Sequence, residues 1–261
     1  MRSYLVEVTP EKATDLLKDR EHQRSLNQNW VTTLSRDMRA GRWQPTPQGL
    51  ILDEDGRLLD GQHRLSAVVR AGVPVQFWIT EGADPGMFKH LDGGRARSMA
   101  DRLKISGYAD PSQLAAITRK VFSWQAGQPW NSGIVATREE LQDIIDKDPL
   151  LMDAAKFAHG WRSRPAPATA AFAWWLLMAI DAEEATWFME RLRNGTELAE
   201  NSGVWAVYDR LWRQAQPGKF QKPQLTIAYM INGWNAQRDG REVHRLMFRN
   251  PLSNDNYPMP H

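Results

Sequence analysis

The 261-residue sequence contains no cysteine, which excludes disulfide bridges, thiolate zinc sites and a cysteine nucleophile. It also has little net charge, because 33 Lys and Arg residues against 31 Asp and Glu residues leave a formal charge of +2. Any field that attracts a polyanion must therefore come from a local patch of the surface. The missing cysteines suit a reducing compartment, and we expect a cytoplasmic protein.

Long hydrophobic runs are missing as well. The longest run, residues 168–180, falls short of the roughly 20 residues that a spanning helix needs, and Pro167 and Asp181 bound it. Residues 1–4 lack the charged and then apolar order of a signal peptide. We therefore expect no membrane partner, and we interpret residues 168–180 as a buried helix.

Tryptophan, by contrast, is abundant, with twelve residues in a chain of otherwise ordinary globular composition. Two interpretations are open. The indole rings are bulky core residues, or some of them form a surface on which nucleic-acid bases stack.

Two sequence patterns follow one another along the chain, and together they predict an α+β fold. Residues 1–97 alternate strand and helix patterns and predict a small mixed sheet packed with helices, whereas residues 98–249 predict an all-helical domain and residues 250–261 an irregular, partly mobile tail. Expected strands lie at 4–8, 49–52, 57–59 and 75–80. Expected helices lie after Pro10, around 26–38, at 61–70, around 87–91, from Ser98, and at 111–126, 137–146, 149–159, 167–180, 182–193, 203–215 and 222–238.

The helix around residues 26–38 has an apolar residue at every fourth position, which predicts one buried face. Its members are Leu26, Trp30, Leu34 and Met38. Arg36 and Arg39 lie off this face, and we expect them in solvent. The polar residues Asn27, Gln28 and Asn29 either contact a base or ribose or cap the helix.

The segment 60–64, Asp-Gly-Gln-His-Arg, joins an expected hairpin to an expected helix. Gly61 lets the backbone turn, and the helix start offers backbone N–H groups and a positive dipole end, which suit a phosphate. Gln62, His63 and Arg64 add an amide, an imidazole and a guanidinium that can grip two phosphate oxygens. Alternatively, Asp60 only caps the helix and Arg64 pairs with a surface carboxylate.

This strand–turn–helix motif resembles the central motif of the ParB/sulfiredoxin superfamily. Gly61, Arg64 and Ala67 match the Gly-Glu-Arg-Arg-x-x-Ala box of ParB proteins, and Gly61, His63 and Arg64 match the Gly-Cys-His-Arg box of sulfiredoxins. The same five residues occur in the DGQHR-type proteins of DNA phosphorothioation systems. The motif is also similar to that of phage proteins labelled "ParB-like nuclease domain". The resemblance covers residues 3–97.

The resemblance implies a nucleoside triphosphate, ATP or CTP, bound with Mg²⁺, and a hydrolase, phosphotransferase or nucleotide switch acting in DNA metabolism. Gly61, Gln62 and Arg64 would bind phosphate, and Asp60 would orient His63 or hold the metal through water, unless it only caps the helix. Gln62 stands where sulfiredoxins have cysteine and ParB proteins glutamate, so redox chemistry is excluded and an amide cannot activate water. His63 is then the candidate for proton transfer, unless it only donates a hydrogen bond to phosphate.

A second segment, 92–98, carries two glycines followed by two arginines just before a capped helix. Gly93, Gly94, Arg95 and Arg97 form either an anion-binding nest that closes on the same phosphates or a flexible hinge between domains.

DNA is a further expected partner, through basic residues that alternate with aromatic ones in the C-terminal half. The alternative is a solvated helical face. Two other functions stay open: a non-catalytic DNA-binding or regulatory module, and a nuclease, for which no acidic metal cluster is visible. The basic residues are Arg210, Arg213, Lys219, Lys222, Arg238, Arg241, Arg245 and Arg249.

Overall fold

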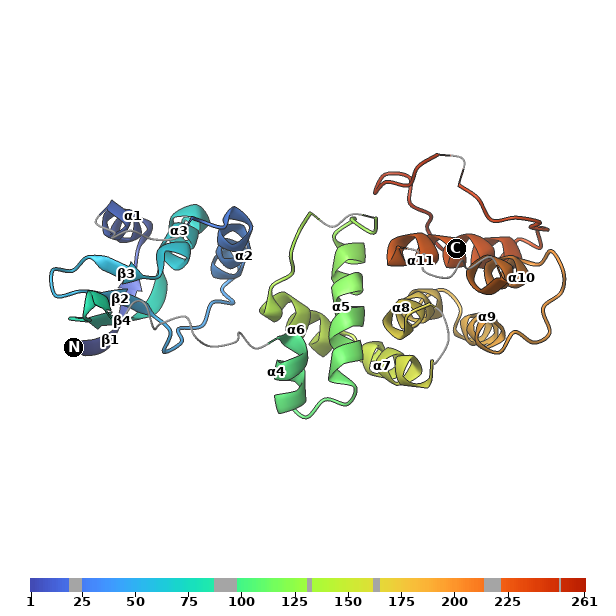
Figure 1. Cartoon of the computed structure of the whole chain (residues 1–261), viewed down its shortest axis with the longest axis horizontal. Coiled ribbons are helices and arrows are strands. Elements are labelled where there is room, and N and C mark those ends of the chain that lie inside the picture. The colour runs from blue at the N-terminus through green and yellow to red at the C-terminus, as the bar shows by residue number, and fades with distance from the viewer. Residues whose placement is uncertain (19–24, 87–97, 131–132, 162–164, 214–221, 249) are drawn as a thin grey trace. The chain divides into compact units, whose positions relative to one another are not determined.

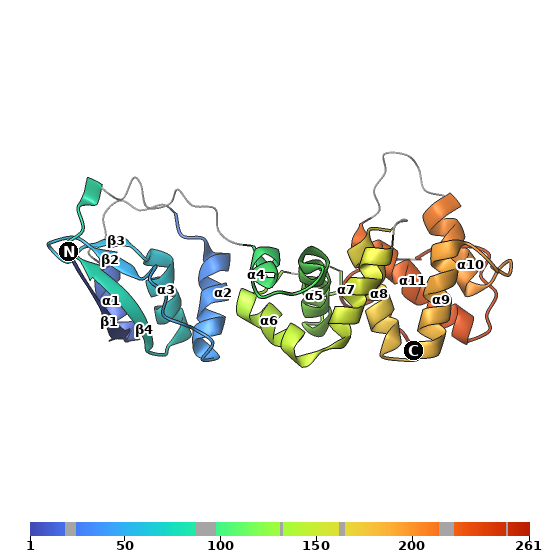
Figure 2. The same ribbon diagram turned by 90° about the horizontal axis from the view of Figure 1, so that it is seen from below.

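The structure is a computed structural model that describes residues 1–261 except 19–24, 87–97, 131–132, 162–164, 214–221 and 249 (Figures 1 and 2). The chain forms two compact units. The first comprises Met1–Ala96 together with Ile134–Glu140, and the second comprises Arg97–Gly133 together with Leu141–His261.

The described secondary structure is mixed α+β, as the sequence predicts. In chain order the elements of residues 1–86 are β1 (Arg2–Val8), α1 (Pro10–Lys18), α2 (Gln28–Arg39), β2 (Leu50–Leu52), β3 (Leu58–Asp60), α3 (Gln62–Ala71) and β4 (Val75–Glu81). The later elements are α4 (Met99–Ile105), α5 (Pro111–Gln125), α6 (Arg138–Lys147), α7 (Leu150–Gly160), α8 (Pro167–Met178), α9 (Ala182–Asn194), α10 (Gly203–Tyr208), a π-helical turn (Asp209–Arg213) and α11 (Pro223–Arg238).

The sheet of the first unit has the strand order β1-β4-β2-β3. β1 pairs with β4 in antiparallel fashion, β4 pairs with β2 in parallel, and β2 and β3 form an antiparallel hairpin. The hairpin turn contains the Asp55-Gly56 pair, whose glycine adopts the positive φ of 82° that such turns require. This hairpin delivers the chain to the segment 60–64.

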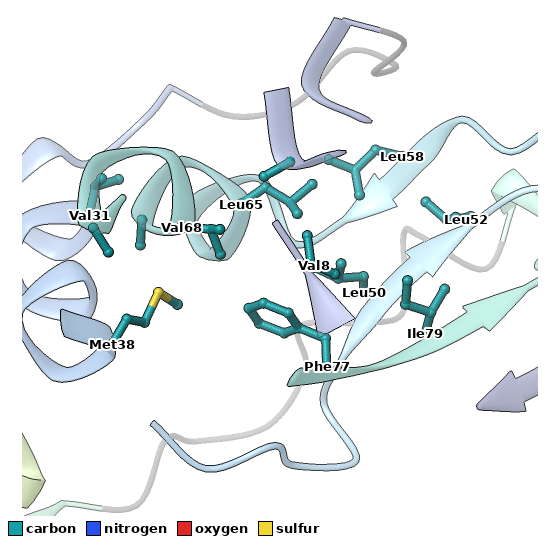
Figure 3. Packing of buried hydrophobic residues seen from close by; sticks show 13 residues of the cluster. Val8, Val31, Met38, Leu50, Leu52, Leu58, Leu65, Val68, Phe77 and Ile79 are labelled. Atoms are coloured by element: carbon teal, nitrogen blue, oxygen red, sulfur yellow. The ribbon is translucent and has the colours of Figure 1, made fainter. Parts of the chain in front are cut away.

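The core of the first unit lies between the sheet and the helix α3 (Figure 3). Leu65 and Val68 point from α3 toward Phe77 and Ile79 of β4, and all four side chains are at most 1% exposed. Burying each contributes about 2 kcal/mol of transfer free energy. α3 also contacts α1 and α2, so its first turn is held at a fixed place above the sheet.

The helix α2 forms where the sequence predicts it, but its buried face is shifted. Val31 and Met38 are buried as expected, whereas Trp30 is 47% exposed. Ser35 and Asp37, which the apolar pattern leaves outside, are 3% and 5% exposed. The face is shifted because Asp37 finds partners inside the unit, as described below.

The second unit is built from helices, with α8 contacting α5, α7, α9 and α11. α8 is buried over most of its length, which confirms the interpretation of residues 168–180 as a buried helix. Trp161 and Trp234 are buried core residues, 2% and 0% exposed. None of the described helices combines the length and the apolar character needed to cross a membrane.

The tail beyond Asn250 has no helix or strand, as predicted, yet it is anchored to α11. The Tyr257 side chain is buried and its hydroxyl donates to the Gln224 carbonyl. The Trp234 indole N–H donates to the His261 carbonyl at 3.1 Å.

Candidate functional site

The turn from β3 into α3 depends on glycine at position 61. Gly61 is the N-cap residue of α3 and adopts φ 116° and ψ 8°, a left-handed conformation that disfavours residues with a side chain. A Cβ at this position would lie 2.5 Å from Leu50 Cδ2, in a side chain that is fully buried. Since glycine supplies no capping side chain, the N-terminal end of α3 keeps the partial positive charge that favours an anion.

Arg64 lies on the first turn of α3 and is held by backbone and side-chain acceptors. Its Nη1 donates to the Gly49 carbonyl at 2.9 Å and contacts Asp60 Oδ2 at 3.4 Å. Among the described residues both hydrogen bonds use Nη1, which leaves Nε and Nη2 to bind a ligand. The side chain is 24% exposed, so the guanidinium is oriented by the protein and still reaches solvent.

The sequence patterns did not indicate that Gly49 belongs to this site. A Cβ there would lie 1.6 Å from the Trp78 carbonyl oxygen, so only glycine fits beside β4. This close approach places the Gly49 carbonyl where Arg64 reaches it. A glycine directly before a strand pattern is the one sequence feature that could have indicated it.

His63 contacts a different element from Arg64. Its Nε2 accepts a hydrogen bond from the backbone N–H of Asn27, at 3.0 Å, at the N-terminus of α2. A neutral imidazole that accepts at Nε2 carries its proton on Nδ1, so in this arrangement Nε2 is engaged and Nδ1 cannot accept a proton. His63 would have to leave Asn27 before it could act in proton transfer.

Asp60 is not the cap of α3, since Gly61 occupies that position. Its contact is with Arg64, and its side chain is 41% exposed. Gln62, next along the chain, is 5% exposed, so its amide lies in the interior rather than on the surface. The structure therefore brings Asp60 and Arg64 together, whereas His63 contacts Asn27 and Gln62 is buried.

A single carboxylate at Asp60 fits one mode of magnesium binding, in which one or two carboxylates and the substrate phosphates hold a largely hydrated ion. No cluster of three or more His, Asp or Glu side chains that could hold a metal ion occurs among the residues that the structure describes. Asp60 would therefore need the phosphates of the ligand to complete the coordination.

The second predicted segment lies outside the described residues. Gly93, Gly94, Arg95 and Arg97 fall in the range 87–97, and the expected short helix at 87–91 falls there too. Described structure resumes at Ser98, which forms the predicted capping box with Asp101.

Asn27 is the N-cap of α2, since its Oδ1 accepts from the Trp30 N–H at 3.1 Å. Of the two alternatives for this residue, the structure shows capping. Asn27 thus has two roles: its side chain caps α2 and its backbone N–H binds His63.

The expectation of solvated arginines on α2 is confirmed for Arg39, which is exposed, but not for Arg36, whose side chain is only 28% exposed. Arg39 Nη2 donates to the Arg70 carbonyl at 2.9 Å, at the C-terminal end of α3, where a cation is favoured by the helix dipole. Arg36 forms an ion pair with Glu140 at 3.0 Å and donates to the Val135 carbonyl. Both side chains therefore tie α2 to neighbouring segments of the first unit.

A buried polar cluster joins α2 to the segment 134–140. Asp37 Oδ1 accepts from Thr137 Oγ1 at 2.9 Å and from Arg42 Nε at 3.0 Å, and Arg42 also contacts Glu140 at 3.3 Å. Burial raises the pKa of Asp37, although the hydrogen bonds from Thr137 and Arg42 oppose it. Burial acts in the same direction on Glu140, but hydrogen bonds from Arg36 and the Thr137 N–H outweigh it and lower the pKa.

Several basic residues considered for DNA binding are engaged inside the second unit. Arg210 donates to the Tyr229 hydroxyl at 3.1 Å and lies over its ring. Arg238 pairs with Glu184 and lies over Trp234, and Arg241 pairs with Asp239 at 2.9 Å. Lys219 and Arg249 lie outside the described residues, and so does the side chain of Arg213. These contacts favour a structural role for Arg210, Arg238 and Arg241.

No protein-family model, curated protein or solved structure matches this chain.

Proposed function

We propose that the segment 60–64 binds the phosphates of a nucleoside triphosphate, and that the protein is a nucleotide-dependent hydrolase, phosphotransferase or switch in DNA metabolism. The ParB/sulfiredoxin-like fold and the cytoplasmic location are part of the same proposal. The DNA association depends on the motif resemblance, whereas the phosphate site also has support from the geometry.

One observation carries the proposal. The protein orients the Arg64 guanidinium at the N-terminus of α3, where no side chain caps the helix. Gly49 and Asp60 orient Arg64 through Nη1, and the remaining guanidinium N–H groups can grip phosphate oxygens. Gly61 brings the backbone of the first turn of α3 close by without a side chain in the way. A charged donor and a helix dipole thus act on one anion.

Mg²⁺ would neutralise part of the phosphate charge and bridge phosphate oxygens. Asp60 is the protein ligand that this proposal assigns to the ion. Because Asp60 also contacts Arg64, the carboxylate would be shared between the ion and the guanidinium or would shift toward the ion on binding.

Isothermal titration calorimetry with ATP, GTP, CTP and inorganic tripolyphosphate, each with Mg²⁺, tests the proposal. We expect binding by the wild-type protein and a loss of about tenfold to a hundredfold in Arg64→Ala, since a charge-assisted hydrogen bond contributes about 1.5–3 kcal/mol. Arg57→Ala is the matched control, because Arg57 lies on the hairpin that leads into this segment, is exposed and pairs only weakly with Asp55.

Absence of binding by any of these ligands, or equal affinity in wild type and Arg64→Ala, would refute the phosphate site. Circular dichroism shows whether Arg64→Ala keeps the fold. Arg64→Lys tests whether binding needs the two parallel hydrogen bonds of a guanidinium, because lysine keeps the charge without the bidentate geometry. Salt-dependent DNA binding that no nucleotide alters would instead support the DNA-binding module.

A further inference from the structure

Trp30 is exposed where the sequence pattern predicts a buried residue. Its side chain is 47% exposed, whereas the neighbouring Val31 is 3% exposed. Among the tryptophans whose exposure the structure describes, only Trp30 and Trp78 have exposed side chains. Leaving an indole in water forgoes a large gain in burial, and an aromatic face that reaches solvent is available to stack on a ligand.

The position of Trp30 relates it to the candidate phosphate site. The Trp30 N–H donates to Asn27 Oδ1, and the Asn27 N–H donates to His63 Nε2. Trp30 therefore belongs to the helical turn that contacts the segment 60–64. Side chains on an α-helix point back toward its N-terminus, so the indole leans toward the end of α2 at which the Asn27 N–H contacts His63 of α3.

The neighbours of Trp30 suit a nucleoside. Gln28 and Asn29 are exposed amides on the same first turn of α2, and they offer both hydrogen-bond donors and acceptors to a base or a ribose. The first turn of α2 contains no acidic residue that would repel a nucleotide. An aromatic ring flanked by neutral amides, on a helix that contacts the proposed phosphate site through His63, combines the groups that recognise the parts of a nucleotide.

We propose that Trp30 stacks on the base of the bound nucleotide and that the preferred ligand is a purine nucleoside triphosphate. This inference depends on the proposed function, because the phosphates must bind at Arg64. Every base has a π-face, but a purine has two fused rings and covers more of the indole than a pyrimidine does. ATP and GTP should therefore bind more tightly than CTP and UTP.

The experiment compares four proteins against ATP, CTP and Mg²⁺-tripolyphosphate by titration calorimetry: wild type, Trp30→Ala, Trp30→Phe and Leu5→Ala. Leu5 supplies the control, since it is a large apolar side chain of the same unit, 44% exposed, on β1. Tripolyphosphate has no base, so it reports on the phosphate site alone.

We expect Trp30→Ala to weaken ATP binding about tenfold or more, in line with the loss of one base-stacking contact, and to leave the tripolyphosphate affinity within about twofold. Trp30→Phe should recover most of the ATP affinity, because phenylalanine keeps an aromatic face. Leu5→Ala should bind both ligands as the wild type does. In the wild type, ATP should bind about threefold to tenfold more tightly than CTP.

Three results would overturn the inference, and they are distinguishable from one another. Unchanged ATP affinity in Trp30→Ala shows that the indole does not stack and points to a protein partner for this surface. An equal loss for ATP and tripolyphosphate shows that Trp30 supports the fold of the site rather than the base. Failure of the wild type to bind either ligand refutes the phosphate site, and the stacking role falls with it.

Discussion

The imidazole of His63 accepts a hydrogen bond at Nε2 from the backbone N–H of Asn27, 3.0 Å away, and so joins the first turn of α3 to the first turn of α2. The two helices are joined a second time at their other ends, where Arg39 donates to the Arg70 carbonyl. α2 and α3 are therefore fixed to each other at both ends. A ligand that displaced His63 from Asn27 would release only one of these connections.

The Asn27 contact predicts the tautomer of His63. Because Nε2 is the acceptor, the neutral ring should carry its proton on Nδ1, and ¹⁵N-detected NMR of the imidazole nitrogens measures this directly. His63→Ala should speed hydrogen exchange at the Asn27 amide while the Trp30 amide, bonded to Asn27 Oδ1, changes less. A ring protonated on Nε2 would contradict the contact.

The conformation and surroundings of Gly61 predict that alanine at this position destabilises the protein. In Gly61→Ala the new Cβ meets the buried Leu50 side chain and the backbone must hold φ 116°, so we expect a loss of about 3 kcal/mol in the free energy of unfolding. Gly56→Ala is the control: its φ is 82°, but no atom lies within 4 Å of its Cβ, so only the backbone strain of about 1 kcal/mol remains. Urea denaturation measures both, and equal losses would show that the Leu50 contact is unimportant.

Local patterns allowed much of the fold to be predicted from the sequence. The Asp55-Gly56 turn, the capping box at Ser98 and the apolar run within 168–180 each depend on residues close together in the chain, and each forms as expected. The start of α3 at Gly61 could be predicted for the same reason. These features need no knowledge of what packs against them.

The features that the sequence did not indicate depend on distant partners. The every-fourth-residue pattern placed Trp30 in the core, but Asp37 lies on the buried side because Thr137 hydrogen-bonds to its carboxylate from 100 residues away. Arg64 was recognised, but its acceptor Gly49 depends on the close approach of Trp78 on β4. No local pattern encodes these contacts.

The lowered pKa of Glu140 predicts that its contribution to stability depends on pH. Its pKa lies below the ordinary value of 4.5 in the folded protein, so its contribution to stability is present above that value and is lost as the pH falls through the folded pKa. Glu140→Gln should therefore lose about 1–3 kcal/mol near pH 7, because Arg36 and Arg42 lose a charged partner. Below about pH 4 the difference from wild type should shrink.

Denaturation at pH 7 and at acidic pH measures this difference, and Glu54→Gln is the control, since Glu54 is exposed at the hairpin tip. Hydrogen exchange locates the effect: protection should fall in residues 134–140 and in α2. A Glu140→Gln deficit that stays constant down to acidic pH would show that the charge of Glu140 is not what stabilises the cluster.

The contacts between residues 250–261 and α11 predict that this tail stabilises the second unit. Tyr257 is 6% exposed, lies edge-on to Trp124 with ring centroids 6.1 Å apart, and burial raises the pKa of its hydroxyl far above the usual range. Tyr257→Ala should reduce the free energy of unfolding by about 3 kcal/mol, whereas Tyr257→Phe should lose about 1 kcal/mol with the hydrogen bond to Gln224. Met259→Ala, at a 62% exposed position, should change it by less than about 0.5 kcal/mol. If thermal denaturation gave the same midpoint for Tyr257→Ala and Met259→Ala, the tail would not be part of the folded core, because a buried aromatic ring cannot be removed from a packed interior without a loss of stability.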